Sequence, residues 1–282
     1  MKKTIQLLMN DQVDRHNEQM SLQVLESARD QTNANIISSH KEHDFRFPPI
    51  ARVNHAYIKN EYGINSLYGE IEFFEPQDIN KQNIIPDKTL KLHDFKKSTI
   101  TYDRTYELNN LVNEINNLQK TISEEKPLFE LKKAFEPIST LIVVVGTIAT
   151  KSFIEGFFNK AGSDFWDALK DIIVKNSQKD EKEKIYIFNT MINRNNYKVE
   201  VIINFTNPTT YDLQNVLYEH QNMIDNTIDN YEKNSINVAR IVFNSNEDDL
   251  YHAYSVFDDG TPFDIKNIDE YEKILEEVLN KV

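Results

Sequence analysis

The chain contains no cysteine and little glycine, with six glycines in 282 residues. The lack of cysteine excludes disulfide bonds, thiolate metal sites and cysteine nucleophiles. It also fits the reducing cytoplasm, where we expect the protein to reside. Neither a P-loop nor the glycine fingerprint of dinucleotide-binding proteins occurs in the sequence. The sequence therefore predicts no cofactor that is held by a glycine-rich loop.

The chain has fewer basic than acidic residues. Lysine and arginine number 32 against 45 aspartates and glutamates, which gives a formal net charge of −13. No run of lysine or arginine is longer than two residues. Such a chain repels phosphate backbones, so we expect no nucleic-acid partner.

Long apolar runs are also missing. The most apolar stretch extends from Ile138 to Phe158 and is interrupted by Lys151 and Glu155. Its uncharged part is shorter than the roughly 20 residues that a membrane-spanning helix needs. We therefore interpret residues 138–158 as a buried helix and expect no membrane association. A membrane-associated effector that uses this segment is the alternative.

What the sequence contains is typical of a folded globular protein, with 39% apolar and 27% charged residues. The elements that it predicts place the chain in the α+β class. We expect a β-rich module over residues 1–105, a helical connector over 106–176 and an α+β module over 177–282. The last module should form a β-β-α-β-β-α sheet with its helices on one face.

In the first module, alternating apolar residues predict strands over Thr4–Met9, Arg52–Lys59 and Ile64–Phe74. Ser21 is a suitable N-cap for a helix over Leu22–Asp30. Further strands are predicted over Asn35–Ser39 and Ser98–Tyr102.

The connector begins with a helical pattern. Apolar residues recur at spacings of three and four, which is a heptad seam of about two heptads; they are Leu108, Leu111, Ile115, Leu118 and Ile122. We expect this seam to pack inside its own domain, and an interface with a second chain is the alternative. Pro127 and Pro137 bracket a further predicted helix over Leu128–Phe135.

The last module follows a polar hinge over Asn176–Lys184. An asparagine-rich turn joins its first two strands, which is a hairpin signal. The predicted strands are Ile185–Ile192, Tyr197–Phe205, Val238–Asn244 and Leu250–Phe257, and the predicted helices are Tyr211–Lys233 and Glu270–Leu279.

One ordered set of segments has a family resemblance. Ile36-Ile37 leads into Ser38-Ser39-His40, Pro48-Pro49 and Ile50-Ala51-Arg52-Val53 follow, and Lys96 to Glu107 contains the strand-like Thr99-Ile100-Thr101-Tyr102. This order resembles the tailed-phage prohead maturation serine proteases over residues 1–105. The resemblance implies a protease-like fold in which the strand that ends in His40 lies in one sheet with the Ser98–Tyr102 strand.

The resemblance also implies a catalytic pair. His40 would be the general base, and Ser98 or Thr99 would supply the nucleophile. The family's serine aligns with Thr99, whereas Ser98 should face the opposite side of the strand. Thr101 and Ala51 stand where the family has glycines. These departures favour a retained fold without catalysis.

Two further sets of polar residues lie in this module. His43, Asp44 and His55 lie close to His40 in the sequence and could bind zinc with it, but two histidines on a loop without a helical His-Glu-x-x-His motif are a weak metal signal, so we predict no metal. The segment with Asp14 and His16 is interpreted as a capping and salt-bridge region, whereas the resemblance implies that either residue could orient the base.

We therefore expect a non-enzymatic protein–protein interaction protein that is built on a degenerate protease-like fold. The resemblance implies a phage, prophage or phage-defence setting. Its partner would be another protein, which the sequence does not identify, and self-association stays open. An active serine-type peptidase that uses His40 with Ser98 or Thr99 is the first alternative. The membrane-associated effector is the second.

Overall fold

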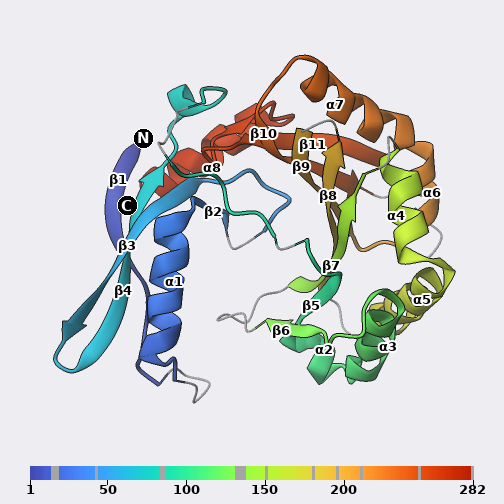
Figure 1. Cartoon of the computed structure of the whole chain (residues 1–282), viewed down its shortest axis with the longest axis horizontal. Coiled ribbons are helices and arrows are strands. Elements are labelled where there is room, and N and C mark those ends of the chain that lie inside the picture. The colour runs from blue at the N-terminus through green and yellow to red at the C-terminus, as the bar shows by residue number, and fades with distance from the viewer. Residues whose placement is uncertain are drawn as a thin grey trace. The chain divides into compact units, whose positions relative to one another are not determined.

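The computed structural model describes residues 1–13, 19–41, 44–82, 87–93, 95–130, 138–149, 152–179, 182–194, 197–209, 212–246 and 249–280. The chain forms two compact units (Figure 1). Unit 1 combines Met1–Leu92 with Tyr254–Val282, and unit 2 is His93–Ala253. Strand β11 (Asp249–Phe257) passes from unit 2 into unit 1. The α+β class is confirmed, but the units divide the chain differently from the three predicted modules.

Unit 1 contains a four-stranded sheet in the order β1-β4-β3-β2. Its strands are β1 (Lys2–Asn10), β2 (Ile37–Ser39), β3 (Ala51–Glu61) and β4 (Ile64–Phe73). Every neighbouring pair is antiparallel. Tyr62 and Gly63 join β3 to β4 with φ angles of 54° and 82°, which is the pattern of a two-residue hairpin turn. The predicted strands of this region are confirmed.

Two helices cover one face of this sheet. Helix α1 (Leu22–Ala34) begins at Ser21, whose side chain accepts a hydrogen bond from Val24 N, as predicted. Leu25 of α1 packs against Ala56 and Leu67. Helix α8 (Ile268–Leu279) packs Tyr271, Ile274 and Leu275 against a cluster that includes Val53, Ile71 and Phe73. Because Leu67, Ile71 and Phe73 alternate along β4, both helices lie on the same face.

The rest of unit 1 is short elements. A 3-10 turn, η2 (Pro76–Asp78), follows β4, and β12 (Pro262–Phe263) pairs with the end of β11. The segment Tyr254–Val282 is therefore needed to complete the core of residues 1–92, although the sequence separates the two by more than a hundred residues.

Unit 2 contains a mixed sheet in the order β11-β10-β9-β8-β7-β5-β6. Its further strands are β5 (Thr99–Asp103), β6 (Leu128–Glu130), β7 (Ile138–Ile148), β8 (Glu183–Arg194), β9 (Tyr197–Thr206) and β10 (Val238–Asn246). The pairs β7–β8 and β9–β10 are parallel, whereas β8 and β9 form the predicted antiparallel hairpin.

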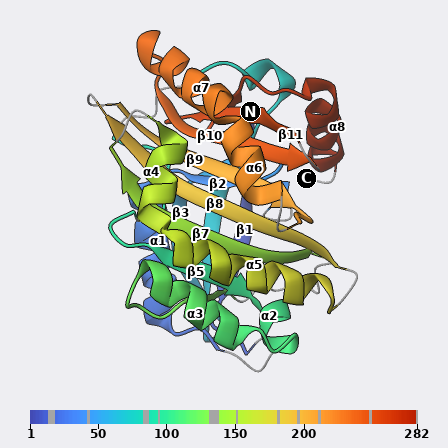
Figure 2. The ribbon, with the colours of Figure 1, turned by 90° about the vertical axis from the view of Figure 1, so that its right-hand side faces the viewer.

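The helices α3 to α7 cover one face of this sheet (Figure 2). The helices of unit 2 are α2 (Arg104–Leu108), α3 (Val112–Ile122), α4 (Phe153–Ala161), α5 (Ser163–Ser177), α6 (Asp212–Glu219) and α7 (Gln221–Lys233). Phe157 of α4 and Trp166 of α5 contact Phe188 of β8, which in turn contacts Phe205 of β9. Of the two helices predicted for residues 177–282, the first corresponds to α6 and α7 on this sheet, whereas the second is α8, which packs in unit 1.

The prediction of one buried helix over Ile138–Phe158 is wrong. Residues 138–148 form strand β7 and only the following part is helical, as α4. Strand β7 lies between β5 and β8 and is buried along most of its length. Its isoleucines, valines and threonines favour a strand, and a strand covered on both faces has the continuous apolar pattern of a buried helix. None of the described helices is long and apolar enough to cross a membrane.

A second predicted helix, over Leu128–Phe135, is also wrong at its start. Leu128–Glu130 forms β6, the edge strand that pairs in parallel with β5. Residues 131–137 lie outside the described part of the chain.

The heptad seam packs inside unit 2, as predicted. Ile115 and Leu118 of α3 are fully buried, and Leu111 is nearly so. Leu108 belongs to the separate helix α2 and is 61% exposed. The pattern therefore marks the inner side of α3, which packs against α5.

Ile115→Glu should unfold unit 2, because a charge without a partner would replace a fully buried side chain at a cost of several kcal/mol. Leu108→Glu is the matched control and should change the free energy of unfolding by less than about 0.5 kcal/mol. Circular dichroism during urea denaturation measures both. A stable, folded Ile115→Glu protein would contradict the packing described for α3.

Candidate functional site

The predicted base, His40, directly follows β2 in unit 1. It is buried, and its Nδ1 lies 2.9 Å from the carbonyl oxygen of Phe47. Its ring packs against Phe45, with the ring centroids 4.7 Å apart, and against Tyr254. These contacts are those of a histidine that fixes its own loop.

The predicted nucleophiles lie in unit 2. Ser98 precedes β5, and its carbonyl oxygen accepts a hydrogen bond from Gln119 Nε2. Thr99 begins β5 and pairs with Val144 of β7. The expectation that these residues share a sheet with the strand before His40 is wrong, because β2 pairs with β3 and β5 pairs with β7 and β6. A catalytic pairing of His40 with either hydroxyl stays a prediction.

The other weighed residues add no site. No group of three or more metal-ligating side chains occurs among the residues that the structure describes. His43, Asp14 and His16 lie outside those residues. His55 lies on β3, where its ring neighbours that of Tyr57.

The first candidate site is the open edge of the unit 1 sheet. Strand β1 is a terminal strand of that sheet, and its one strand partner among the described residues is β4. Ile5 and Leu7 are 57% and 50% exposed. They pair with Glu70 and Tyr68, so they lie on the face opposite to α1 and α8, which we call the outer face.

The outer face has an aromatic centre beside this edge. Tyr68 of β4 stacks on Tyr57 of β3, with the ring centroids 5.7 Å apart and an interplanar angle of 19°. Ile5 and Leu7 therefore continue an apolar surface that begins at the two tyrosines. An open strand edge offers unpaired backbone groups to which another strand can hydrogen-bond. That strand would also cover the apolar side chains beside the edge.

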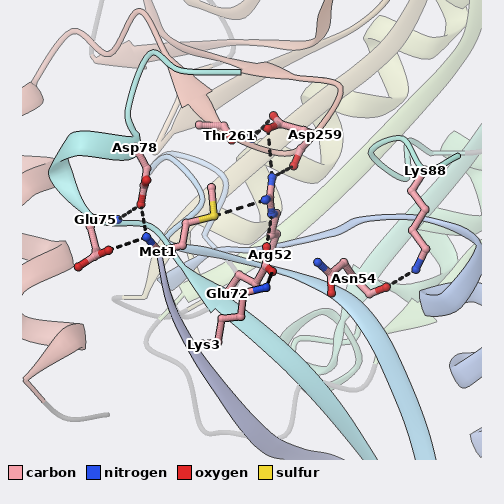
Figure 3. A network of polar contacts seen from close by, with 10 residues as sticks. All are labelled: Met1, Lys3, Arg52, Asn54, Glu72, Glu75, Asp78, Lys88, Asp259 and Thr261. Atoms are coloured by element: carbon pink, nitrogen blue, oxygen red, sulfur yellow. Dashed lines mark hydrogen bonds and ion pairs between the residues drawn. The ribbon is translucent and has the colours of Figure 1, made fainter. Parts of the chain in front are cut away.

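A buried arginine holds this edge in place (Figure 3). Arg52 of β3 is 4% exposed, and its Nε donates a hydrogen bond of 2.8 Å to Glu72 Oε2 on β4. Its Nη1 donates to the carbonyl oxygen of Asp259 at 2.7 Å and to the carboxylate at 3.1 Å. Arg52 thus connects β3, β4 and the segment from Tyr254 onward.

The start of β1 joins the same network. Lys3 forms an ion pair with Glu72, at 2.5 Å, and the sulfur of Met1 lies 3.3 Å from Arg52 Nη2. The amino group of Met1 contacts the carboxylates of Glu75 and Asp78. Charged contacts therefore fix the beginning of β1 against the sheet, as Figure 3 shows.

The turn that carries Asp259 needs a glycine. Gly260 has a φ of +82°, and a Cβ at this position would lie 3.2 Å from Ile36 Cγ2. Thr261 completes the turn, because its N and Oγ1 donate hydrogen bonds to the carboxylate of Asp259. This local geometry aims the carboxylate and carbonyl of Asp259 at the guanidinium of Arg52.

Burial would raise the pKa of Glu72, but hydrogen bonds and charge attraction from Lys3 and Arg52 outweigh burial and lower it. The carboxylate therefore stays ionised at neutral pH. The two carboxylates depend on the buried arginine, since loss of its positive charge would leave two negative charges close together without a partner.

The second candidate site is a polar cluster on the sheet of unit 2. Glu200 of β9 is fully buried, and its Oε2 accepts a hydrogen bond of 2.6 Å from Arg240 Nε of β10. Its Oε1 accepts a hydrogen bond of 2.8 Å from Asn189 Nδ2 of β8. These residues lie on the face opposite to Phe188 and its helices, because side chains alternate along a strand.

His93 extends this cluster toward solvent. Its Nδ1 lies 2.6 Å from Glu200 Oε1, and its side chain is 33% exposed. The same Nδ1 lies 2.7 Å from Asn189 Nδ2, so His93, Asn189 and Glu200 form one hydrogen-bonded cluster. Burial would raise the pKa of Glu200, but Arg240, His93 and Asn189 outweigh burial and lower it well below its usual range.

A pocket of about 250 Å³ borders His93. Among the described residues that line it, three have basic side chains, namely His93, Lys96 and Lys198, and none is acidic. Phe95 and Met191 supply apolar walls, and Thr147 and Asn193 supply neutral polar groups. This is an unusual local excess of positive charge in a chain with a net charge of −13.

Comparisons with family models, curated proteins and solved structures find no match to this chain. Function must therefore be argued from the sites themselves.

Sequence reasoning missed both networks, although one signal was available. Glu200 lies within an otherwise apolar stretch, Val199–Ile203, and Arg240 lies within Val238–Phe243. A lone charge in a buried strand needs a partner of opposite sign. Arg52 and Glu72 show the same pattern on the adjacent strands β3 and β4, where they are register partners.

Arg52→Met should lower the free energy of unfolding by about 3–5 kcal/mol, because Glu72 and Asp259 would lose their shared cation. Arg29→Met is the control, since Arg29 pairs with the exposed Asp30, and it should cost less than about 0.5 kcal/mol. Urea denaturation measures both. Equal effects of the two substitutions would contradict the role given to Arg52.

Glu200→Gln should weaken the acid sensitivity of unit 2. The folded-state pKa of Glu200 is depressed, so its stabilisation is present above the unfolded pKa of about 4.3 and is lost as the pH falls through the folded value. Wild-type stability should therefore decline steeply below about pH 4.3, and the variant, less stable at pH 7, should decline less. Urea midpoints across pH, with exposed Glu219→Gln as control, test this. Parallel curves for wild type and Glu200→Gln would overturn it.

Proposed function

We propose that this chain is a non-enzymatic interaction protein that binds a second copy of itself by strand addition along β1. The observation that carries the proposal is the open edge of β1 with Ile5 and Leu7 each at least half exposed. A long apolar edge is uncommon in a monomer, because it offers both backbone hydrogen bonds and apolar area to another strand.

The sequence of β1 complements itself in an antiparallel arrangement. With the two-fold axis at Gln6, Ile5 of each copy faces Leu7 of the other on the outer face, where cross-strand apolar pairs stabilise a sheet. A bulge lies between Leu7 and Met9, so this pairing is confined to the residues around Gln6.

The anchoring of β1 supports this use of the edge. Lys3 and Met1 are held by Glu72, Glu75 and Asp78, so the first part of the strand is anchored before a partner arrives. Binding to a pre-ordered edge loses less conformational entropy than binding to a loose one.

The peptidase alternative has less support. A general base needs its nucleophile within hydrogen-bond reach, whereas the strand before His40 and the strand that carries Thr99 belong to different sheets. The ring of His40 is buried and packs against Phe45 and Tyr254. The setting in a phage, a prophage or phage defence rests on the sequence resemblance alone and stays a prediction.

Leu7→Lys should weaken self-association by roughly 100-fold, because both equivalent leucines of the dimer would lose about 1.5 kcal/mol of apolar burial each. Val24→Lys on α1 is the matched control, since Val24 is 49% exposed and lies away from the edge. Sedimentation across a dilution series measures the effect, and circular dichroism confirms folding.

A wild-type protein that stays monomeric through the whole dilution series would overturn the proposal. So would a dimer that Leu7→Lys and Val24→Lys weaken equally. A wild-type monomer that binds a different protein, with Leu7→Lys abolishing that complex, would replace the second copy as the occupant of this edge.

A further inference from the structure

We infer that the pocket beside His93 is a binding site for a small organic phosphate. The inference does not depend on the proposed function, because it concerns unit 2 and a different set of residues. The pocket of about 250 Å³ lies below the usual range for drug-sized ligands, so it suits a compact molecule.

The charge of the pocket favours an oxyanion. Lys96 and Lys198 are exposed residues on its wall, and His93 is the third basic group. Behind His93, the charge of Glu200 is balanced by Arg240 at 2.6 Å, so the buried pair adds no net charge. Among the described residues of the pocket wall, all the charged side chains are therefore basic, and phosphate gains from several such donors at once.

A buried hydrogen-bond network holds His93 in place beside the pocket. Glu200 holds its Nδ1 at 2.6 Å, so the ring is fixed at the border of the pocket. Asn189, 1% exposed, fixes the same carboxylate oxygen and keeps the arrangement rigid. A ring held by a buried carboxylate keeps a fixed orientation, as histidines with a carboxylate partner do at other sites.

The apolar wall identifies the rest of the ligand. Phe95 is buried at 8% exposure and Met191 likewise, and both line the pocket next to the basic residues. A flat apolar group attached to the phosphate would pack on this wall. A phosphate monoester of an aromatic or similarly flat alcohol should therefore bind more tightly than inorganic phosphate.

Titration of the full chain with phenyl phosphate and with inorganic phosphate, followed by amide chemical shifts at physiological salt, tests the site. Phenyl phosphate should saturate shifts at Phe95, Met191 and Lys198, and it should bind more tightly than inorganic phosphate. Benzoate, which carries a carboxylate on the same ring, should bind more weakly, because it offers fewer oxygens to the basic groups.

Lys198→Met should weaken phenyl phosphate binding by roughly tenfold, which is the loss expected for one charge-assisted hydrogen bond. Lys198→Arg should retain most of the affinity, and Lys120→Met on α3 is the matched control, since Lys120 is exposed on a helix. Because Lys198 is exposed, these variants should fold normally.

Three results would overturn the inference. The first is the absence of saturable shifts with either phosphate at millimolar concentration. The second is an equal loss of affinity in Lys198→Met and Lys120→Met, which would indicate only general attraction of anions. The third is tighter binding of benzoate than of phenyl phosphate, which would replace phosphate by a carboxylate as the ligand group.

Discussion

The buried guanidinium of Arg52 is the interaction on which unit 1 depends. It joins β3 to Glu72 of β4 and to Asp259, a residue 207 positions later in the chain. Two carboxylates on one cation form a set that is costly to break, because each remaining charge would be buried without compensation. The register of the sheet, the return of the last segment and the attachment of Met1 and Lys3 all converge on this group.

Unit 2 also contains a buried ion pair between an arginine and a carboxylate. Arg240 and Glu200 form a buried pair on neighbouring parallel strands, and the pair holds His93 at the border of a basic pocket. In unit 1 the buried pair stabilises an edge strand, whereas in unit 2 it orients a partly exposed side chain. Each candidate site is therefore built on charges that the solvent does not reach.

Much of the fold follows from local patterns in the sequence. The sequence correctly predicts three such features, namely the strand with alternating residues at Thr4–Met9, the helix cap at Ser21 and the asparagine-rich hairpin between β8 and β9. The apolar run that forms β7 was wrongly predicted as a helix, because burial on both faces removes the alternation of apolar and polar residues that distinguishes a strand. The sites were not predicted, since the pairing of Arg52 with Asp259 and of His93 with Glu200 depends on contacts across long sequence separations.

Amide hydrogen exchange across a concentration series tests the central claim most directly, namely that the anchored edge of β1 receives a second copy. Protection of the amides in Lys2–Asn10 should rise with protein concentration, while protection of β2, at the other edge of the sheet, should stay constant. Exchange in β1 that is independent of concentration would contradict the account.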